Sequence, residues 1–209
     1  ETDFPKNDVC ILSGPSFANE VARGLPFAIS CSSDDLNLAR KLSIVLNREG
    51  MRVYAISDNI GVEVSGAMKN VLAIASGVCD GLSLGLNARA SLITRGMAET
   101  VRLGVALGAE KDTFLGLAGA GDLFLTTTGE LSRNRKVGRE IASGVELKEV
   151  LSNLGQVAEG VSNAPKLLSL GRALKVSLPI TREVCLLLDK KKDAREALNS
   201  LLKREPSDE

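Results

Sequence analysis

The first quarter of the chain alternates short apolar runs with helix-like segments. Three apolar runs are the strand candidates: residues 9–12, 27–31 and 52–56. Between them, residues 16–23 and 35–46 have the apolar periodicity of helices. Strands that alternate with helices are typical of an α/β sheet, and three strands make a poor independent sheet. We therefore expect residues 1–57 to be the last part of a larger Rossmann-type α/β domain.

The strand pattern stops near residue 58, and helix signals fill the rest of the chain. The predicted helices cover residues 59–76, 87–108, 132–142, 147–154, 164–174, 179–189 and 193–203. Gly77 and Gly108 are predicted to end the first two of these helices, and Asn87 to cap the second. Pro179 suits the first turn of its helix. The prediction is a mainly α chain with an all-helical domain over residues 58–209.

Composition limits the possible functions. Lys+Arg and Asp+Glu both total 26, so the net charge is zero, which argues against a general nucleic-acid binder. No apolar stretch approaches ~20 residues, so we expect no membrane span. Four cysteines without a short paired spacing indicate reduced thiols rather than a disulfide framework or a zinc site. We expect a soluble, cytoplasmic protein, because no signal peptide opens the chain. An organellar form stays open, because Glu1 is not a natural translation start and a longer parent could have lost its targeting sequence.

The chain contains no histidine, so proton transfer near neutral pH requires another side chain. Lys69 is the best-placed candidate, because it shares a helical face of small residues with Ser65 and Ala73. A ligand or another backbone can approach such a face closely. The alternative is close helix packing, with the ammonium group of Lys69 reaching out to water.

A glycine-rich run, Gly116-Leu-Ala-Gly-Ala-Gly-Asp122, is the second candidate. Three glycines in six residues disfavour a helix but allow the backbone to lie close to a ligand. Asp122 could then pair with a lysine, orient it, or accept a hydrogen bond from a hydroxyl group. The alternative is a turn between helices in which Asp122 is an N-cap.

Two further segments are candidate anion sites. Ser132 is a good N-cap, and the helix that follows it begins with Arg133, Asn134, Arg135 and Lys136. Free backbone amides, the positive end of the helix dipole and a guanidinium group together suit a phosphate; the alternative is an exposed basic turn. The second segment, Ser13-Gly-Pro-Ser-Phe-Ala18, follows a strand, where ligands bind in open α/β sheets, and Ser16 could cap the next helix.

Taken in order, these segments resemble the NAD(P)-dependent sn-glycerol-3-phosphate dehydrogenase family. The resembling runs are Ser13-Gly-Pro-Ser-Phe-Ala18, Gly66-Ala-Met-Lys-Asn-Val-Leu-Ala-Ile74, Leu86-Asn-Ala-Arg-Ala90, Gly116-Leu-Ala-Gly-Ala-Gly-Asp-Leu123, Leu131-Ser-Arg-Asn-Arg135 and Val157-Ala-Glu-Gly160. The resemblance implies a Rossmann domain followed by a helical domain like that of 6-phosphogluconate dehydrogenase. It also implies reversible hydride transfer between NAD or NADP and glycerol 3-phosphate or dihydroxyacetone phosphate, feeding glycerophospholipid synthesis.

The resemblance also implies roles for single residues and a homodimer. Lys69 would accept and donate the proton of the substrate C2 oxygen, with Asp122 as its catalytic partner. Six positions would contact the substrate: Gly14, Ser16, Asn70, Ser132, Arg133 and Asn134. Four positions would face the cofactor: Ala18, Arg133, Val157 and Glu159.

The chain departs from the family in having no GxGxxG nucleotide loop. We therefore expect this chain alone to bind NAD(P) poorly and to be inactive, and the choice between NAD and NADP stays open. Two other functions also stay open. One is a related dehydrogenase acting on 6-phosphogluconate or a ketopantoate-like acid. The other is a non-catalytic helical module for dimerisation or phosphate binding.

Overall fold

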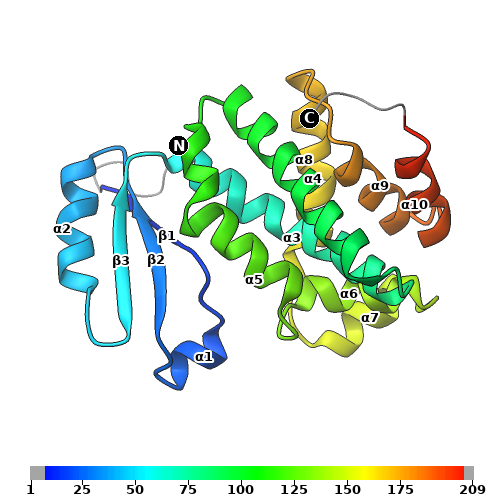
Figure 1. Ribbon diagram of the computed structural model, residues 1–209, viewed down its shortest axis with the longest axis horizontal. Coiled ribbons are helices and arrows are strands. Elements are labelled where there is room, and N and C mark those ends of the chain that lie inside the picture. The colour runs from blue at the N-terminus through cyan, green and yellow to red at the C-terminus, as the bar shows by residue number, and fades with distance from the viewer. Residues whose placement is uncertain (1–7, 205–209) are drawn as a thin grey trace.

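The computed structural model describes residues 8–204 and shows a small sheet beside a larger helical part (Figure 1). Within those residues the sheet contains β1 (Ile11–Ser13), β2 (Phe27–Ser32) and β3 (Met51–Ile56). The central strand β2 pairs antiparallel with β1 and parallel with β3. Leu12 lies opposite Cys31 in the first pair. The strand predictions are confirmed, except that β1 begins at Ile11 rather than at residue 9.

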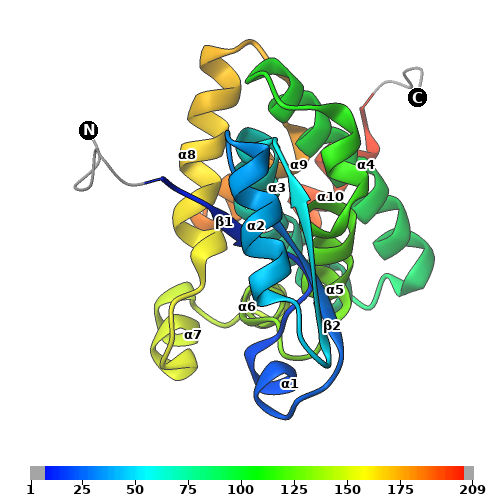
Figure 2. The same cartoon turned by 90° about the vertical axis from the view of Figure 1, so that its left-hand side faces the viewer.

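Two helices accompany the strands. α1 (Ala18–Ala22) follows β1, and α2 (Leu36–Leu46) forms the crossover that a parallel pair of strands requires. Figure 2 shows α2 along one face of the sheet, where Ala39 packs with Ile29 and Val53 in a small apolar cluster.

The helical part begins at Asn59, directly after the last strand. Its first helix is α3 (Asn59–Gly81), and the others are α4 (Gly85–Ala106), α5 (Asp122–Thr128), α6 (Arg133–Ala142), α7 (Leu147–Leu154), α8 (Glu159–Ala173), α9 (Pro179–Leu188) and α10 (Ala194–Leu202). This arrangement confirms a mainly α fold after a few strands. The division into domains at residues 57 and 58 stays a prediction.

α3 is the core helix of the helical part. It packs against α4, α5, α6, α8 and α9, and Val71, Leu72 and Ala73 are almost fully buried. Its length and composition would allow it to cross a membrane, so the expectation that no apolar stretch approaches that length is wrong. In this structure 72% of its most apolar window is buried inside the protein, as expected for a helix covered on all sides by neighbouring helices.

Gly77 does not end α3, contrary to the prediction. A Cβ atom on Gly77 would lie within 3.0 Å of the backbone oxygen of Arg135 in α6, which real Cβ atoms essentially never show. A Cβ atom on Gly138 would crowd the backbone oxygen of Ile74 in the same way. The two glycines therefore mark the place where the backbones of α3 and α6 touch, and α3 continues past it to Gly81.

Helix boundaries that depend on neighbouring residues agree with the sequence. α7 has the predicted bounds, and α9 begins with Pro179 in its first turn. α10 follows Asp193, which forms a capping box with Glu196. These signals are local, so the sequence pattern contains them.

The starts of two other helices differ from the prediction. α4 begins at Gly85, so Asn87 lies inside the helix and is not its N-cap. α8 begins at Glu159 rather than at residue 164, because the backbone N–H of Gly160 donates to the side chain of Asn134 in α6. No local sequence pattern shows a cap that comes from another helix.

The two glycine-containing turns also differ from the prediction. Residues Leu117–Gly121 form a π-helix that leads directly into α5 at Asp122, and a 3₁₀ helix at Lys111–Leu115 precedes it. Asp122 is thus the first residue of a helix that the glycine pattern hid. Ser16 does not cap α1: Phe17 is the N-cap residue, no side chain caps this helix, and the Ser16 hydroxyl donates to the backbone oxygen of Gly14 at 3.1 Å.

Candidate active site

Lys69 of α3 and Asp122 of α5 form an ion pair. The Lys69 Nζ donates to the Asp122 Oδ2, across 53 positions of sequence. The carboxylate side chain is 5% exposed and the lysine side chain 24% exposed. The structure thus makes the pair that the sequence suggested, with a buried carboxylate behind an ammonium group that partly reaches the surface.

The surroundings of Asp122 fix the direction of its carboxylate. Burial raises the pKa of Asp122, while the charge of Lys69 and the hydrogen bonds from Lys69 and Thr126 lower it. The Thr126 Oγ1 donates to the Asp122 Oδ1 at 3.2 Å. Each carboxylate oxygen therefore has its own donor. Thr126 is not among the predicted site residues, although its spacing of four residues from Asp122 places the two side chains on one face of α5.

Beside Lys69, a chain of amide hydrogen bonds joins α3, α6 and α8. The Asn134 Nδ2 donates to the Asn70 Oδ1 at 2.8 Å, and the Asn70 Nδ2 donates to the Glu159 Oε2 at 3.0 Å. The Asn134 Oδ1 accepts from the backbone N–H of Gly160 at 2.9 Å. Both asparagines are buried, whereas Glu159 is exposed. Three of the predicted site residues are thus held in one network next to the ion pair.

The first turn of α6 presents a cap and an arginine. Ser132 is the N-cap as predicted, since its hydroxyl accepts from the backbone N–H of Arg135 at 3.3 Å. Arg133 is exposed, and its Nη1 donates to the Gln156 Oε1 at 3.3 Å. No signal in the single sequence pointed to Gln156. A helix amino terminus beside a guanidinium group is a suitable place for an anion.

Two of the cations predicted to bind an anion on this turn are already paired with carboxylates of the protein. Arg135 is buried and paired with Asp80 and Glu130, and Lys136 is paired with Glu140. The protein's own carboxylates, which come from α3, from the loop before α6 and from α6 itself, neutralise these two cations. Of these cations, Arg133 is therefore the proposed anion contact, because its hydrogen-bond partner is the uncharged Gln156.

The turn after β1 lies against α5. Gly14 has φ +150°, and a Cβ atom there would lie 2.9 Å from the Cα of Ile29, so the position requires glycine. A Cβ atom on Gly121 would meet Pro15 at 3.4 Å, and one on Gly129 would meet Phe17 at 2.5 Å. Residues 14–18 therefore run along α5, the helix that begins with Asp122.

The residues expected to face a cofactor lie on different elements. Arg133, Val157 and Glu159 are exposed on α6, before α8 and on α8, and Val157 is 70% exposed. Ala18 is exposed too, but it begins α1, which lies beyond the end of α5 and apart from α8 in both views (Figures 1 and 2). The structure therefore does not bring Ala18 to the hydrogen-bonded group.

The arrangement supports proton transfer next to a bound anion. Lys69 has an ammonium group that can donate a proton, Asp122 accepts a hydrogen bond from it, and Arg133 lies on the helix that Asn134 ties to α3. A hollow of about 590 Å³ lies elsewhere, between α8 and α9, where Pro165, Leu168 and Arg182 are among the lining residues. Neither Lys69 nor Asp122 lines that hollow, so its size says nothing about the candidate site.

Comparison with known proteins identifies the family. A sequence model described as the C-terminus of NAD-dependent glycerol-3-phosphate dehydrogenase matches residues 58–199, and the corresponding N-terminus matches residues 1–39. A glycerol-3-phosphate dehydrogenase (NAD(P)+) of Nitrosospira multiformis is 51% identical over 199 residues, which cover 95% of this chain and 60% of the relative. The relative from Polaromonas naphthalenivorans is 55% identical, with 95% and 56% covered.

A solved structure agrees with these sequence matches. The crystal structure of glycerol-3-phosphate dehydrogenase from Coxiella burnetii matches with a TM-score of 0.90 and 43% identity, over 93% of this chain and 60% of that one. The chain therefore spans about 60% of the length of the curated relatives that it matches. Because the C-terminal family model alone covers more than half of the sequence, the chain belongs to the NAD-dependent glycerol-3-phosphate dehydrogenase family.

Proposed function

We propose that the full-length protein containing this chain interconverts sn-glycerol 3-phosphate and dihydroxyacetone phosphate with NAD or NADP. The observation that carries the proposal is the Lys69–Asp122 ion pair, which lies beside the Asn70–Asn134 hydrogen bond and the first turn of α6. Relatives at 51% and 55% identity bear the name of this activity, which supports the same substrate class.

Lys69 is the proposed proton carrier. During reduction its ammonium group donates a proton to the C2 carbonyl oxygen, and during oxidation its neutral amine accepts the proton of the C2 hydroxyl. Asp122 accepts the hydrogen bond of the ammonium group, stabilises its charge and is oriented by Thr126. When bound, NAD or NADP supplies or takes up the hydride at C2.

The first turn of α6 is the proposed phosphate site. Arg133 offers two N–H groups in a plane, the geometry that phosphate oxygens accept best, and Gln156 restrains its side chain. Ser132 and Asn134 add polar atoms on the same turn, and Asn70 continues the contact toward Lys69. Gly14 and Ser16 are proposed to reach the substrate from the segment that runs along α5. Holding the phosphate fixes C2 relative to the Lys69 ammonium group.

The exposed residues Arg133, Val157 and Glu159 fit a nicotinamide nucleotide, and Ala18 is proposed to contact it from α1. Val157 offers an apolar surface to a ring, Arg133 offers positive charge to a phosphate, and Glu159 can accept a hydrogen bond from a hydroxyl. The Asn70 Nδ2 donates to the Glu159 Oε2 at 3.0 Å, which ties this position to α3, the helix that carries Lys69.

We further propose a cytoplasmic homodimer whose glycerol 3-phosphate is used for glycerophospholipid synthesis. The family resemblance supports these three points, and the zero net charge supports the absence of nucleic acid as a partner. Light scattering of the purified full-length protein tests the dimer, and a mass of one subunit would contradict it.

The variant Arg133→Ala tests the phosphate site. Loss of a charge-assisted contact of about 1.5–3 kcal/mol is expected to raise KM for dihydroxyacetone phosphate about 10- to 100-fold. Initial rates of the full-length variant measure the effect. Lys136→Ala is the matched control, because it removes the same charge from the same helix, where Glu140 already pairs with it. An unchanged KM in Arg133→Ala, or an equal rise in Lys136→Ala, would contradict the assignment.

A further inference from the structure

Arg135 lies in the same helical turn as the proposed phosphate contacts but projects away from them. Successive residues are about 100° apart around a helix, so Arg133 and Arg135 leave α6 on opposite sides. Arg133 is exposed, whereas Arg135 is only 8% exposed. The function proposed above gives Arg135 no role, although it is a buried cation within two residues of the phosphate site.

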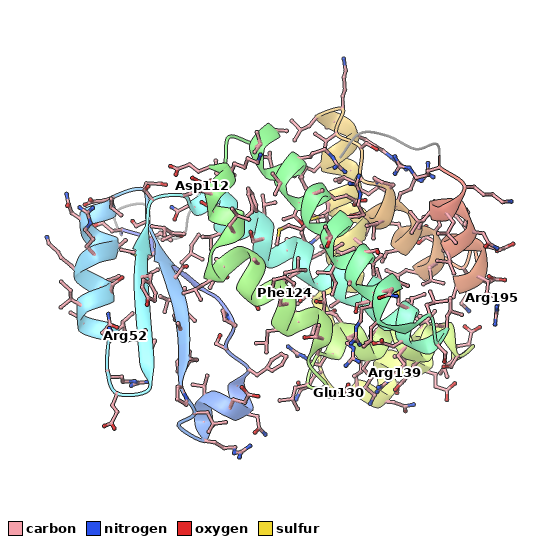
Figure 3. All side chains as sticks on the ribbon, in the orientation of Figure 1. Arg52, Asp112, Phe124, Glu130, Arg139 and Arg195 are labelled. Atoms are coloured by element: carbon pink, nitrogen blue, oxygen red, sulfur yellow. The ribbon has the colours of Figure 1, made fainter. Side chains whose placement is uncertain are left out.

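The Arg135 guanidinium group joins three segments of the chain. Its Nε donates to the Asp80 Oδ2 at 2.7 Å, in the last turn of α3. Its Nη1 donates to the Glu130 Oε1 at 2.6 Å, in the loop that connects α5 to α6. Figure 3 labels Glu130 in this loop, near Arg139. Asp80 in turn accepts from the Arg89 Nη1 of α4 at 3.0 Å. One side chain thus ties the start of α6 to α3, to α4 through Asp80, and to the end of α5.

The backbone of Arg135 is held as firmly as its side chain. Its carbonyl oxygen lies against Gly77 of α3, where no Cβ atom would fit, and its N–H donates to the capping hydroxyl of Ser132. Asp80 lies one helical turn after Gly77 on α3. The close approach of the two backbones at Gly77 and Gly138 sets the distance between the helices. The ion pairs to Asp80 and Glu130 set the rotation of α6 about its own axis.

We propose that Arg135 is a positioning residue for the phosphate site. By fixing the rotation of the first turn of α6, its ion pairs hold Arg133 and Asn134 in the direction in which they meet the substrate. Glu130 belongs to the short loop after α5, so the same ion pairs also relate the phosphate site to the helix that begins with Asp122. This inference rests on the function proposed above.

The test compares two variants of the full-length protein with the wild type. Arg135→Lys keeps the charge but loses the planar fork that bridges two carboxylates, and Asp80→Asn weakens the same bridge from α3. In both variants we expect KM for dihydroxyacetone phosphate, and the calorimetric Kd of glycerol 3-phosphate, to rise about 10-fold. Because Lys69 and Asp122 are untouched, kcat at saturating substrate is expected to stay within about threefold.

Glu183→Gln is the control for a general loss of stability. Glu183 is a buried carboxylate on α9 that pairs with Arg182 and Lys192, so this variant also removes the ion pairs of a buried charge. Its thermal midpoint is expected to fall, with KM unchanged. A folded Arg135→Lys and a folded Asp80→Asn with wild-type KM and Kd would overturn the positioning role. So would an equal rise of KM in Glu183→Gln.

The experiment separates this inference from the proposed function. A wild-type protein that neither turns over nor binds glycerol 3-phosphate contradicts the proposed function and the positioning role with it. A wild-type protein that does both, with variants that bind equally well, contradicts the positioning role alone.

Discussion

Lys69→Ala in the full-length protein is expected to lower kcat about 100- to 10,000-fold, the usual contribution of a positioned acid or base. KM for dihydroxyacetone phosphate should change little, because the proposed phosphate contacts lie on α6 and not on Lys69. The 209 residues of this chain contain no histidine that could take over the proton. Initial rates in both reaction directions measure the effect.

Asp122 provides the control for this variant. Lys69→Ala leaves a buried carboxylate without its ammonium partner, so part of any loss could reflect reduced stability. The double variant Lys69→Ala with Asp122→Asn removes that unpaired charge. It should recover thermal stability but not activity. A single Lys69→Ala variant with near-normal kcat would refute the proton-transfer role, and recovery of activity in the double variant would reduce Lys69 to a structural role.

Gly138→Ala is expected to destabilise the helical part by about 3 kcal/mol or more, at the upper end of what overpacking costs. The added methyl group would meet the backbone oxygen of Ile74, and neither helix can move without disturbing the α3–α6 contact. For a chain of this size, the thermal midpoint should fall by about 6–12 °C. Circular dichroism of the chain during heating measures it.

Gly66→Ala is the matched control for that substitution. Gly66 also lies inside a long helix, α3, but nothing lies within 4 Å of the position that its Cβ atom would take. There the gain in helix propensity should leave stability unchanged or raise it by up to about 1 kcal/mol. Equal midpoints for the two variants would show that the close contact of α3 and α6 is not needed for stability.

The sequence predicted those features whose causes lie nearby in the chain. Ser132, Pro179 and Asp193 begin helices as their local patterns indicate, and the period of apolar residues located most helices. One contact between distant residues could also be predicted, from the charges of the side chains. The ammonium group of Lys69 can pair with a carboxylate, and the glycine-rich run contains Asp122, 53 positions away.

Features with distant causes could not be predicted. The local pattern predicts that Gly77 ends a helix, but glycine is required there because the backbone of α6 lies against it. Arg135 was counted as an anion-binding cation, but its partners Asp80 and Glu130 come from other segments. Residue type showed which groups could do chemistry, and only packing showed which of them were already neutralised.

The most direct test uses the wild-type full-length protein with three substrates. Dihydroxyacetone phosphate, ketopantoate and 6-phosphogluconate are each supplied with the matching nicotinamide nucleotide, and the absorbance of the reduced nucleotide is followed. We expect kcat/KM for dihydroxyacetone phosphate to exceed the other two values at least about 100-fold, since a site built for one set of polar groups rejects substrates that leave them unpaired. No turnover of dihydroxyacetone phosphate, or a higher kcat/KM for either of the other two, would contradict the proposed function.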